Sequence, residues 1–366
     1  MGTIKRGFAN NILTTGKFDA TDLSGTIPSS NVANTTLSSI TSVPASVGDL
    51  VQSVASDPSP AAAGDIWYNS TSGTFKAAVF LADAWASGGN MTTARRALWG
   101  AGSQTEALAF GGYIGPTISA ETEEYNGTSW GPGGNLSTSR YHLAGAGTQT
   151  AGLAFGGMFP TGVKLSATEE YDGSTWTGGG SLGTARYVLS GGGVQTAAFA
   201  FGGSTPTPAI TADTEEYNGS TWTAGGNYPV SIAGAGSTGT QTAGLGFAGS
   251  APPGYTNTTN EYDGTSWSAS NPVNTARAYV GASGSQTSTV FFGGATPSTT
   301  TGETESYNGT SWNISSASLS TVRSTLASSG TSGTSALAFG GEAGSNSTST
   351  EEFTGAALAT KTVTTS

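Results

Sequence analysis

Hydrophobic and polar positions repeat along this chain with a period near 46 residues. A short apolar run ends in phenylalanine and is followed by a glycine pair at Gly111-Gly112. The same pattern returns at 156-157, 202-203, 293-294 and 340-341, with Ala248-Gly249 in the remaining register. The spacings are 45, 46, 46, 45 and 47 residues, and tyrosines and tryptophans follow in step. Such a period indicates a repeat architecture.

Each repeat predicts about four short β-strands. The run before the glycines alternates large and small residues, as in Leu108-Ala109-Phe110, which is typical of a strand with one buried face. An Asn-Gly or Asp-Gly pair, first at 126-127, separates each tyrosine from its tryptophan and is a strong hairpin signal. Four strands in about 46 residues match one blade of a β-propeller.

The order Gly-Gly, then Tyr, then Trp resembles kelch repeats, and the resemblance covers residues 78–356. It implies an all-β fold: a six-bladed kelch-like β-propeller of four-stranded blades, closed by an N-terminal strand and preceded by an extended N-terminal arm. The strand around Trp85 would complete the blade of residues 323–356, so that no sheet edge stays open. The aromatic anchors expected to be structural are Trp85, Trp130, Trp176, Trp222, Trp267 and Trp312.

Arginine and glutamate share a second regularity. Both occur at fixed positions in five repeats, and the fourth repeat lacks both, with Ile232 and Asn260 in their places. We therefore expect each arginine to meet its glutamate in a structural ion pair, since a partner offsets the penalty of burying a charge. The residues concerned are Arg95, Arg140, Arg186, Arg277, Arg323, Glu123, Glu169, Glu215, Glu305 and Glu351.

The remaining segments differ in composition. Residues 1–60 are rich in Ser, Thr, Asn and Ala and are expected to form an extended low-complexity arm that a partner orders. Residues 61–77 are predicted to be a small hairpin and linker, and residues 357–366 a C-terminal tail. The sequence GDIWYNSTSGTFK, at 64–76, resembles a hairpin motif of bacteriophage tail-fibre and other virion proteins.

The amino-acid composition argues against several classes of metal site and binding partner. The chain has no cysteine and one histidine, which argues against zinc-thiolate, Fe–S and multi-histidine metal sites, and we expect no cofactor or metal. Its 12 basic and 23 acidic residues give a net charge of −11, which argues against nucleic acid as a partner. The N-terminus lacks an apolar signal region and no stretch is long enough for a spanning helix, so we expect synthesis in the host cytoplasm and no membrane insertion.

Neither candidate for catalysis is persuasive. His142, expected in an inner strand, is interpreted as a hydrogen-bonded structural residue, because catalysis would need a nucleophile and an orienting acid beside it. The adjacent Glu-Glu pairs, such as Glu123-Glu124, recur in most repeats, and neighbours on a strand point to opposite faces. Functional residues are therefore sought where the repeats differ, in the loops after the glycines. The candidate ligand-binding aromatics are Tyr113, Phe159 and Tyr255.

These observations predict a non-enzymatic phage virion protein of the tail-fibre or tail-tip kind. Residues 1–60 would attach it to other virion or tail proteins, and the propeller loops would bind a host-surface glycan or protein. A homo-oligomer on the particle is compatible with this role. The affinity is expected to come from shape, stacking and hydroxyl groups, not from charge. The alternatives are a bacterial cell-surface lectin or adhesin, a propeller hydrolase, or a capsid or tail decoration protein without receptor binding.

Overall fold

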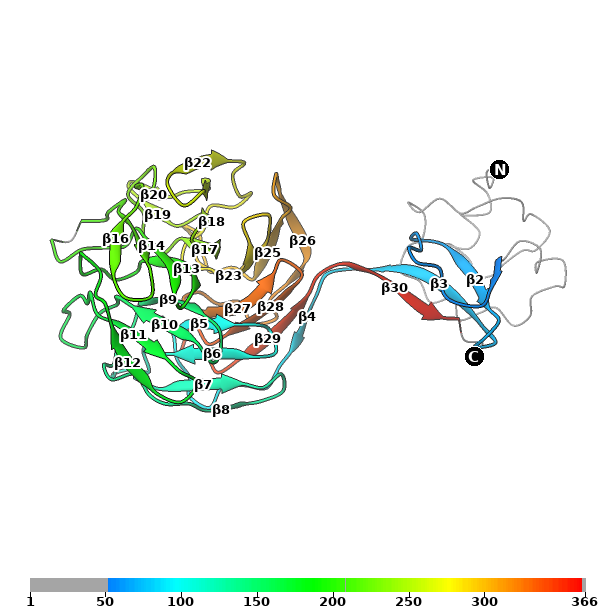
Figure 1. The fold of residues 1–366 in the computed structure, drawn as a ribbon, viewed down its shortest axis with the longest axis horizontal. Helices are drawn as coiled ribbons and strands as arrows, with labels where there is room; N and C mark the ends of the chain where they lie inside the picture. The colour runs from blue at the N-terminus through cyan, green and yellow to red at the C-terminus, as the bar shows by residue number, and fades with distance from the viewer. Residues whose placement is uncertain (1–51, 208, 364–366) are drawn as a thin grey trace. The chain divides into compact units, whose positions relative to one another are not determined.

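A computed structural model describes residues 52–207 and 209–363. Within these ranges every regular element is a β-strand and no helix is present, as the sequence predicts. The strands belong to two units, one formed by Asp83–Gly355 and one by Met1–Ala82 together with Ala356–Ser366 (Figure 1). The predicted arm, apart from residues 52–60, lies outside the described residues.

The Asp83–Gly355 unit contains six four-stranded antiparallel sheets, one for each sequence repeat. This arrangement is consistent with a blade-repeat fold. The first three sheets are β5 (Trp99–Gly102), β6 (Ala107–Phe110), β7 (Thr122–Tyr125) and β8 (Trp130–Pro132); β9 (Ala144–Gly147), β10 (Gly152–Phe155), β11 (Thr168–Tyr171) and β12 (Trp176–Gly179); and β13 (Ser190–Val194), β14 (Ala197–Phe201), β15 (Thr214–Tyr217) and β16 (Trp222–Ala224).

The other three sheets follow the same plan. They are β17 (Gly236–Thr240), β18 (Ala243–Phe247), β21 (Thr259–Tyr262) and β22 (Trp267–Ser270); β23 (Gly281–Ser285), β24 (Ser288–Phe292), β25 (Glu303–Tyr307) and β26 (Trp312–Ser318); and β27 (Ala327–Ser332), β28 (Ser335–Phe339), β29 (Thr350–Thr354) and β4 (Ala84–Ser87). A two-stranded hairpin, β19 (Ser250–Ala251) with β20 (Gly254–Tyr255), is inserted in the fourth repeat. We number the sheets one to six in this order.

The sixth sheet combines the two ends of the unit. Strand β4 pairs antiparallel with β29, and Trp85 lies opposite Phe353 in the register. The predicted pairing of the Trp85 strand with the last repeat is therefore present. In Figure 1 the first strand of each sheet lies toward the middle of the unit and the fourth strand toward its outside.

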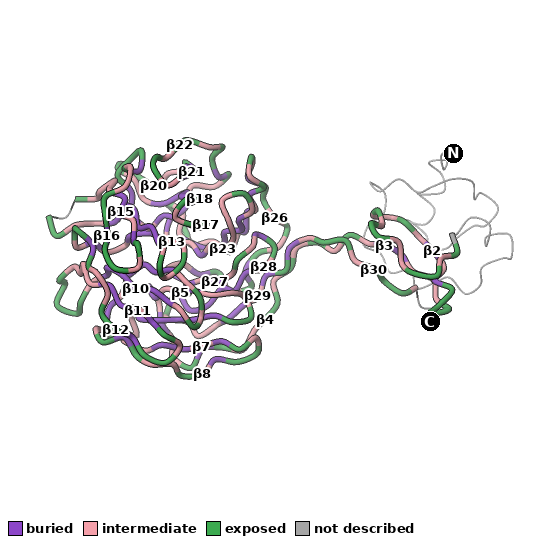
Figure 2. The backbone as a smooth tube through the Cα atoms, viewed as in Figure 1, coloured by how far each residue is buried: buried purple, intermediate pink, exposed green. Residues whose placement is uncertain are grey.

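The second strand of each sheet is the most buried. All four residues of β10 are buried, and so are the last four of the five residues of β28 (Figure 2). The glycine pair ends this strand with positive φ angles of 66° and 107° at Gly111 and Gly112. A Cβ on Gly111 would lie 2.7 Å from the carbonyl oxygen of Arg140 in the next repeat, so the close approach of the two backbones requires glycine.

Aromatic contacts join neighbouring sheets. The phenylalanine before each glycine register packs against the tryptophan of the following sheet, with ring centroids 4.7–5.0 Å apart in all six cases. Each tryptophan also donates its Nε1–H to a threonine of the preceding sheet at 2.9–3.0 Å, as Trp130 does to Thr350. The tryptophans are thus structural anchors between sheets.

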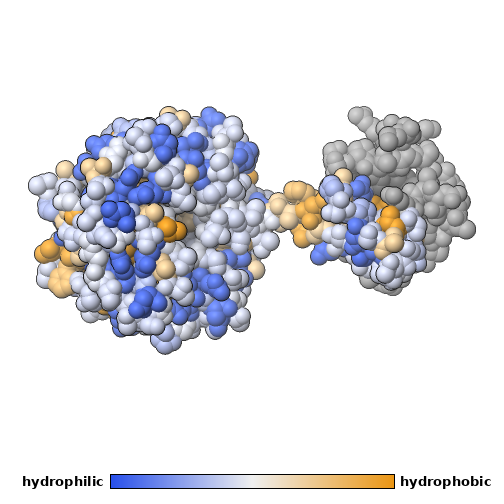
Figure 3. Space-filling model, in the orientation of Figure 1, coloured by the Kyte–Doolittle hydropathy of each residue, from blue (hydrophilic) through white to orange (hydrophobic). Residues whose placement is uncertain are grey.

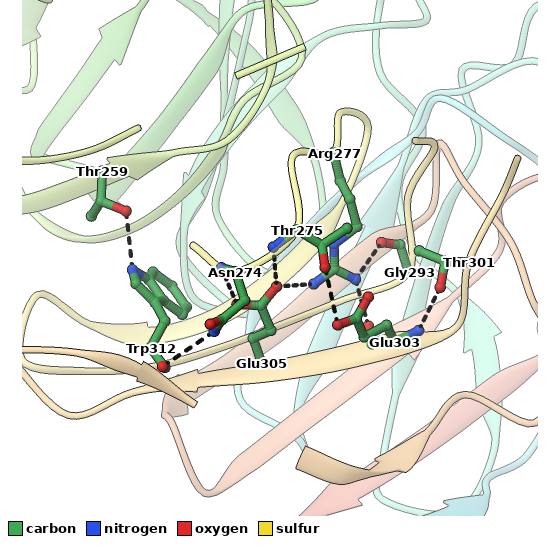
Figure 4. Close-up of polar contacts among 9 residues, drawn as sticks. All are labelled: Thr259, Asn274, Thr275, Arg277, Gly293, Thr301, Glu303, Glu305 and Trp312. Atoms are coloured by element: carbon green, nitrogen blue, oxygen red, sulfur yellow. Dashed lines mark hydrogen bonds and ion pairs between the residues drawn. The ribbon is translucent and has the colours of Figure 1, made fainter. Parts of the chain in front are cut away.

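The predicted arginine–glutamate pairs are confirmed. All five form within one repeat, at 2.5–3.0 Å between nitrogen and oxygen, and every guanidinium is fully buried. Figure 4 shows the fifth repeat, where Arg277 also donates to the carbonyl oxygens of Gly293 and Glu303. Burial lowers the pKa of Arg277, and the charge of Glu305 opposes that shift. Each arginine therefore ties the start of its repeat to the second and third strands.

The fourth repeat replaces the ion pair with a neutral set. Asn260 Nδ2 donates to the hydroxyl of Tyr228 at 2.8 Å, and that hydroxyl donates to the carbonyl oxygen of Gly246 at 3.1 Å. A Cβ on Gly246 would lie 2.9 Å from the ring of Tyr228. Ile232, in the arginine position, is buried. Four residues of the fourth repeat therefore differ together from the other repeats. The sequence pattern reveals Ile232 and Asn260, but not Tyr228 and Gly246.

The other unit is a sheet with the order β1–β2–β3–β30, built from β1 (Gln52–Val54), β2 (Ile66–Asn69), β3 (Thr74–Leu81) and β30 (Ala357–Thr362). The predicted hairpin at 64–76 is present. Two predicted boundaries are wrong, because β3 continues to Leu81 and the supposed tail of 357–366 contains β30, which pairs with β3. Asp57 joins the hairpin by accepting hydrogen bonds from Trp67, Asn69 and Lys76.

Candidate functional site

A circuit of six backbone hydrogen bonds lies just before the first strands. It involves the second residue after each repeat arginine position: Ala97, His142, Val188, Gly234, Tyr279 and Thr325. Each N–H donates to the carbonyl of the equivalent residue one repeat earlier at 2.8–3.0 Å, and Ala97 donates to Thr325. All six have positive φ angles between 50° and 60°, although only one is glycine. The backbone is the same in every repeat, so the side chains are free to differ.

The six circuit residues lie around a small depression. We call this end of the depression, with the circuit residues around it, the mouth. The depression has a volume of about 60 Å³ and is lined by the circuit residues, by the apolar residue directly after each of them, and by Trp99. The first strands beyond it line a second hollow with glycine, alanine and serine. The larger side chains therefore lie at the mouth, and the smaller ones line the second hollow.

Aromatic rings form a continuous arc at the mouth. Tyr113 lies 5.9 Å from Tyr141, Tyr141 lies 5.1 Å from His142, and His142 lies 6.2 Å from Tyr187 between ring centroids. Tyr279 of the fifth repeat also lies 6.2 Å from His142. The four tyrosines of this group are partly exposed, so they can contact a ligand.

A cation stands at each end of this arc. The guanidinium of Arg96 lies 4.9 Å from the centre of the Tyr113 ring, and the ammonium of Lys164 lies 5.3 Å from that of Tyr187. Arg96 also forms an ion pair with Glu342. We call Arg96, Tyr113, Tyr141, His142, Tyr187 and Lys164 the mouth arc.

His142 differs from its sequence prediction. It precedes β9, outside any strand, and has a φ of 51°. Its N–H and carbonyl belong to the circuit, but its imidazole makes no hydrogen bond to another residue in the described ranges. Burial, with the charge of Arg96 second, lowers the pKa of His142 to about 4, so the ring is neutral at pH 7. His142 therefore contributes an uncharged aromatic ring to the mouth.

Of the three predicted ligand-binding aromatics, Tyr113 is the one that shares a ring contact with the arc in the described residues. Tyr113 belongs to the mouth arc. Phe159 is 37% exposed in the second repeat's loop, and Tyr255 lies on β20, opposite Ser250. No ring contact joins Phe159 or Tyr255 to the arc within the described residues.

Sequence reasoning missed Tyr141, Tyr187 and Lys164. Lys164 lies in the loop after Gly156-Gly157, where only aromatic residues were considered. For the two tyrosines the signal was present, because the two positions after each arginine vary between repeats: they read Arg-Ala, Tyr-His, Tyr-Val, Ala-Gly, Ala-Tyr and Ser-Thr. These two positions follow the repeat arginine and lie outside the loops after the glycine pairs. A prediction based on those loops alone therefore does not include them.

The repeated carboxylates are occupied by structural contacts. Of the pair Glu123-Glu124, Glu123 bonds Arg95, and Glu124 accepts from the hydroxyl of Tyr171 in the next repeat at 2.6 Å. The two side chains face opposite ways, as predicted. The described residues contain no group of three or more His, Cys, Asp or Glu that could hold a metal ion. They also include no helix long and apolar enough to cross a membrane.

In Figure 3 the visible face of the Asp83–Gly355 unit is mostly hydrophilic or intermediate, with small hydrophobic patches at its left edge and near its middle. The exposed large apolar residues include Val194, Ile314 and, in one loop, Phe159 and Val163. The mouth arc is therefore the most distinctive group of side chains in this unit.

No protein-family model matches the chain, and no curated protein matches it.

Proposed function

We propose that the Asp83–Gly355 unit is a six-bladed kelch-like β-propeller in a non-enzymatic phage virion protein. The protein would belong to the tail fibre or tail tip, and the mouth would bind a host-surface glycan or protein. The observation that carries the proposal is the mouth arc: aromatic side chains gather where the repeats differ, on a backbone that is the same in all six. The repeated residues are accounted for by contacts within and between the sheets, whereas the aromatic residues of the mouth arc are not repeated.

Contacts between sheets support the propeller part of the proposal. The phenylalanine–tryptophan and tryptophan–threonine contacts each occur six times, and both include a contact from the sixth sheet to the first. The six backbone hydrogen bonds of the circuit return to their starting residue. A sheet array with no free end would also protect its strand edges from pairing with other chains.

The virion part of the proposal rests on the N-terminal segments. The hairpin at 64–76 is of the kind found in phage tail-fibre proteins by resemblance of sequence, and residues 1–60 would attach the protein to its neighbours on the particle. A non-enzymatic role is supported by the structural contacts that occupy the repeated glutamates. An aromatic surface suits recognition, since stacking on a sugar or a protein needs no reacting group.

The direct test is mass spectrometry of purified particles, combined with a competition assay. We expect peptides of this chain in the virion and a delay of phage adsorption when purified protein is added to host cells. A Tyr141→Ala, Tyr187→Ala variant should lose the competition. Val194→Ser, at the far end of β13 from the mouth, is the matched control and should compete like the parent. Absence of the chain from particles would overturn the proposal.

A further inference from the structure

The surface cations of the Asp83–Gly355 unit are confined to the mouth. Between residues 83 and 355 the sequence has seven lysines and arginines. Five are the fully buried repeat arginines, each paired with its glutamate. The remaining two are Arg96 and Lys164, at the two ends of the mouth arc. A unit with a large excess of acidic residues therefore places both of its accessible cations on the mouth arc, one at each end.

Most carboxylates of the unit are held elsewhere. The first glutamate of each pair faces a repeat arginine, and the second accepts a hydrogen bond from a tyrosine of the following sheet, as Glu170 does from Tyr217. Glu342 is the one carboxylate that an ion pair brings to the arc. The local field at the mouth is therefore more favourable to an anion than the net charge suggests.

The two cations are not equivalent. Arg96 shares its charge with Glu342, whereas Lys164 makes no ion pair or hydrogen bond within the described residues. Lys164 projects over the ring of Tyr187, which leaves the ammonium donors available to an acceptor beside that ring. A ligand that packs beside Lys164 on the arc would thus meet an aromatic ring and a cation together.

We propose that the mouth arc binds a saccharide whose pyranose ring carries a carboxylate. The inference deepens the proposed function and rests on it. A pyranose presents a flat face of C–H groups that packs on an aromatic ring, and the tyrosines supply such surfaces. The carboxylate is the anion that the ammonium of Lys164 pairs with by a charge-assisted hydrogen bond. A neutral sugar would use the rings and leave Lys164 unused.

The test uses the full chain and a pair of matched probes. The first probe is tetragalacturonate, and the second is its methyl ester, which keeps the shape and removes the charge. Calorimetry or a fluorescence titration at low salt should show that the acid binds about tenfold more tightly than the ester, with an affinity that falls as salt is added.

Variants separate the two parts of the site. Lys164→Gln should weaken binding of the acid about tenfold and leave the ester unchanged. Lys361→Gln, which removes an exposed lysine of β30, is the charge-matched control and should bind like the parent. Tyr187→Leu should weaken both probes. Circular dichroism and the thermal midpoint check that each variant is folded.

Two outcomes would overturn the inference. Equal affinity for acid and ester would remove the role of the carboxylate, and failure of both probes to bind at millimolar concentration would remove the saccharide site. Neither result would bear on whether the chain is a virion component, which particle mass spectrometry tests separately.

Discussion

The indole Nε1–H of Trp85 donates a 3.0 Å hydrogen bond to Thr304 Oγ1, which joins the sixth sheet to the fifth. Every other junction has two further contacts. A tyrosine hydroxyl bonds a glutamate of the preceding sheet, and a glutamine side chain donates to two of its backbone carbonyls, as Gln104 does to Ala336 and Phe353. At this junction Phe353, Ser306 and Gly333 occupy the three positions, so both contacts are missing.

Restoring one of these contacts should stabilise the protein. Phe353→Tyr with Ser306→Glu rebuilds the tyrosine–glutamate pair, and a hydrogen bond to a charged acceptor contributes about 1.5 kcal/mol. Each single change adds a polar group without its partner and should give no gain. Denaturant unfolding of the parent, both single variants and the double variant measures the coupling. Additive effects would show that the two side chains do not meet.

The buried ion pairs can be tested in the third repeat. Arg186→Ile leaves Glu215 buried without its cation and should lower the free energy of unfolding by about 3–5 kcal/mol. Adding Glu215→Asn and Leu182→Tyr copies the neutral set of the fourth repeat, but Ala200 occupies the position of Gly246.

The full transfer therefore needs Ala200→Gly as a fourth change. We expect the four-residue variant to recover most of the lost stability and the three-residue variant to remain unstable, because the tyrosine ring meets the alanine Cβ. Urea unfolding measures all of these variants. Equal stability with and without Ala200→Gly would contradict the geometry.

His142 predicts a pH dependence. Its pKa is lowered from about 6.5 to about 4 in the folded protein, so the unfolded chain binds more protons between these values. Folding stability attributable to this residue is complete above pH 6.5, falls as the pH drops toward 4, and stays constant below that, with a total of at most about 3 kcal/mol.

The measurement is the thermal midpoint between pH 7 and pH 4 for the parent and for His142→Gln. Carboxylates titrate in both proteins, so the difference between the two curves isolates the histidine. The variant should lose less stability on acidification than the parent. Parallel curves would mean that the imidazole is solvated and has an ordinary pKa.

Much of the repeat unit could be predicted because its determinants are local and recur. The hairpin residues, the glycine pairs and the joint loss of arginine and glutamate in the fourth repeat all leave a trace in one chain. The compensation by Tyr228 and Gly246 leaves none, since a tyrosine in a leucine register becomes informative only when its hydroxyl is seen to meet Asn260.

The mouth was predicted only in part, for a different reason. Tyr113 was a candidate from its loop, but its contact with Tyr141 arises from packing between neighbouring repeats, which the variation of single positions does not reveal. The pairing of β30 with β3 was missed likewise, because it joins segments from opposite ends of the chain and has no repeat to mark it.

The central claim, that the start of the Asp83–Gly355 unit completes its last sheet, has a direct test. Ala84 and Thr354 are register partners, about 5 Å apart between Cα atoms in such a pair, and the chain has no cysteine. Ala84→Cys with Thr354→Cys should therefore form an intramolecular disulfide on mild oxidation, visible as a mobility shift without reductant. Ala84→Cys with Thr223→Cys, on β16 of the third sheet, is the control and should stay reduced or cross-link only between molecules. A first pair that fails to close within one chain, or a control that closes as readily, would contradict the account.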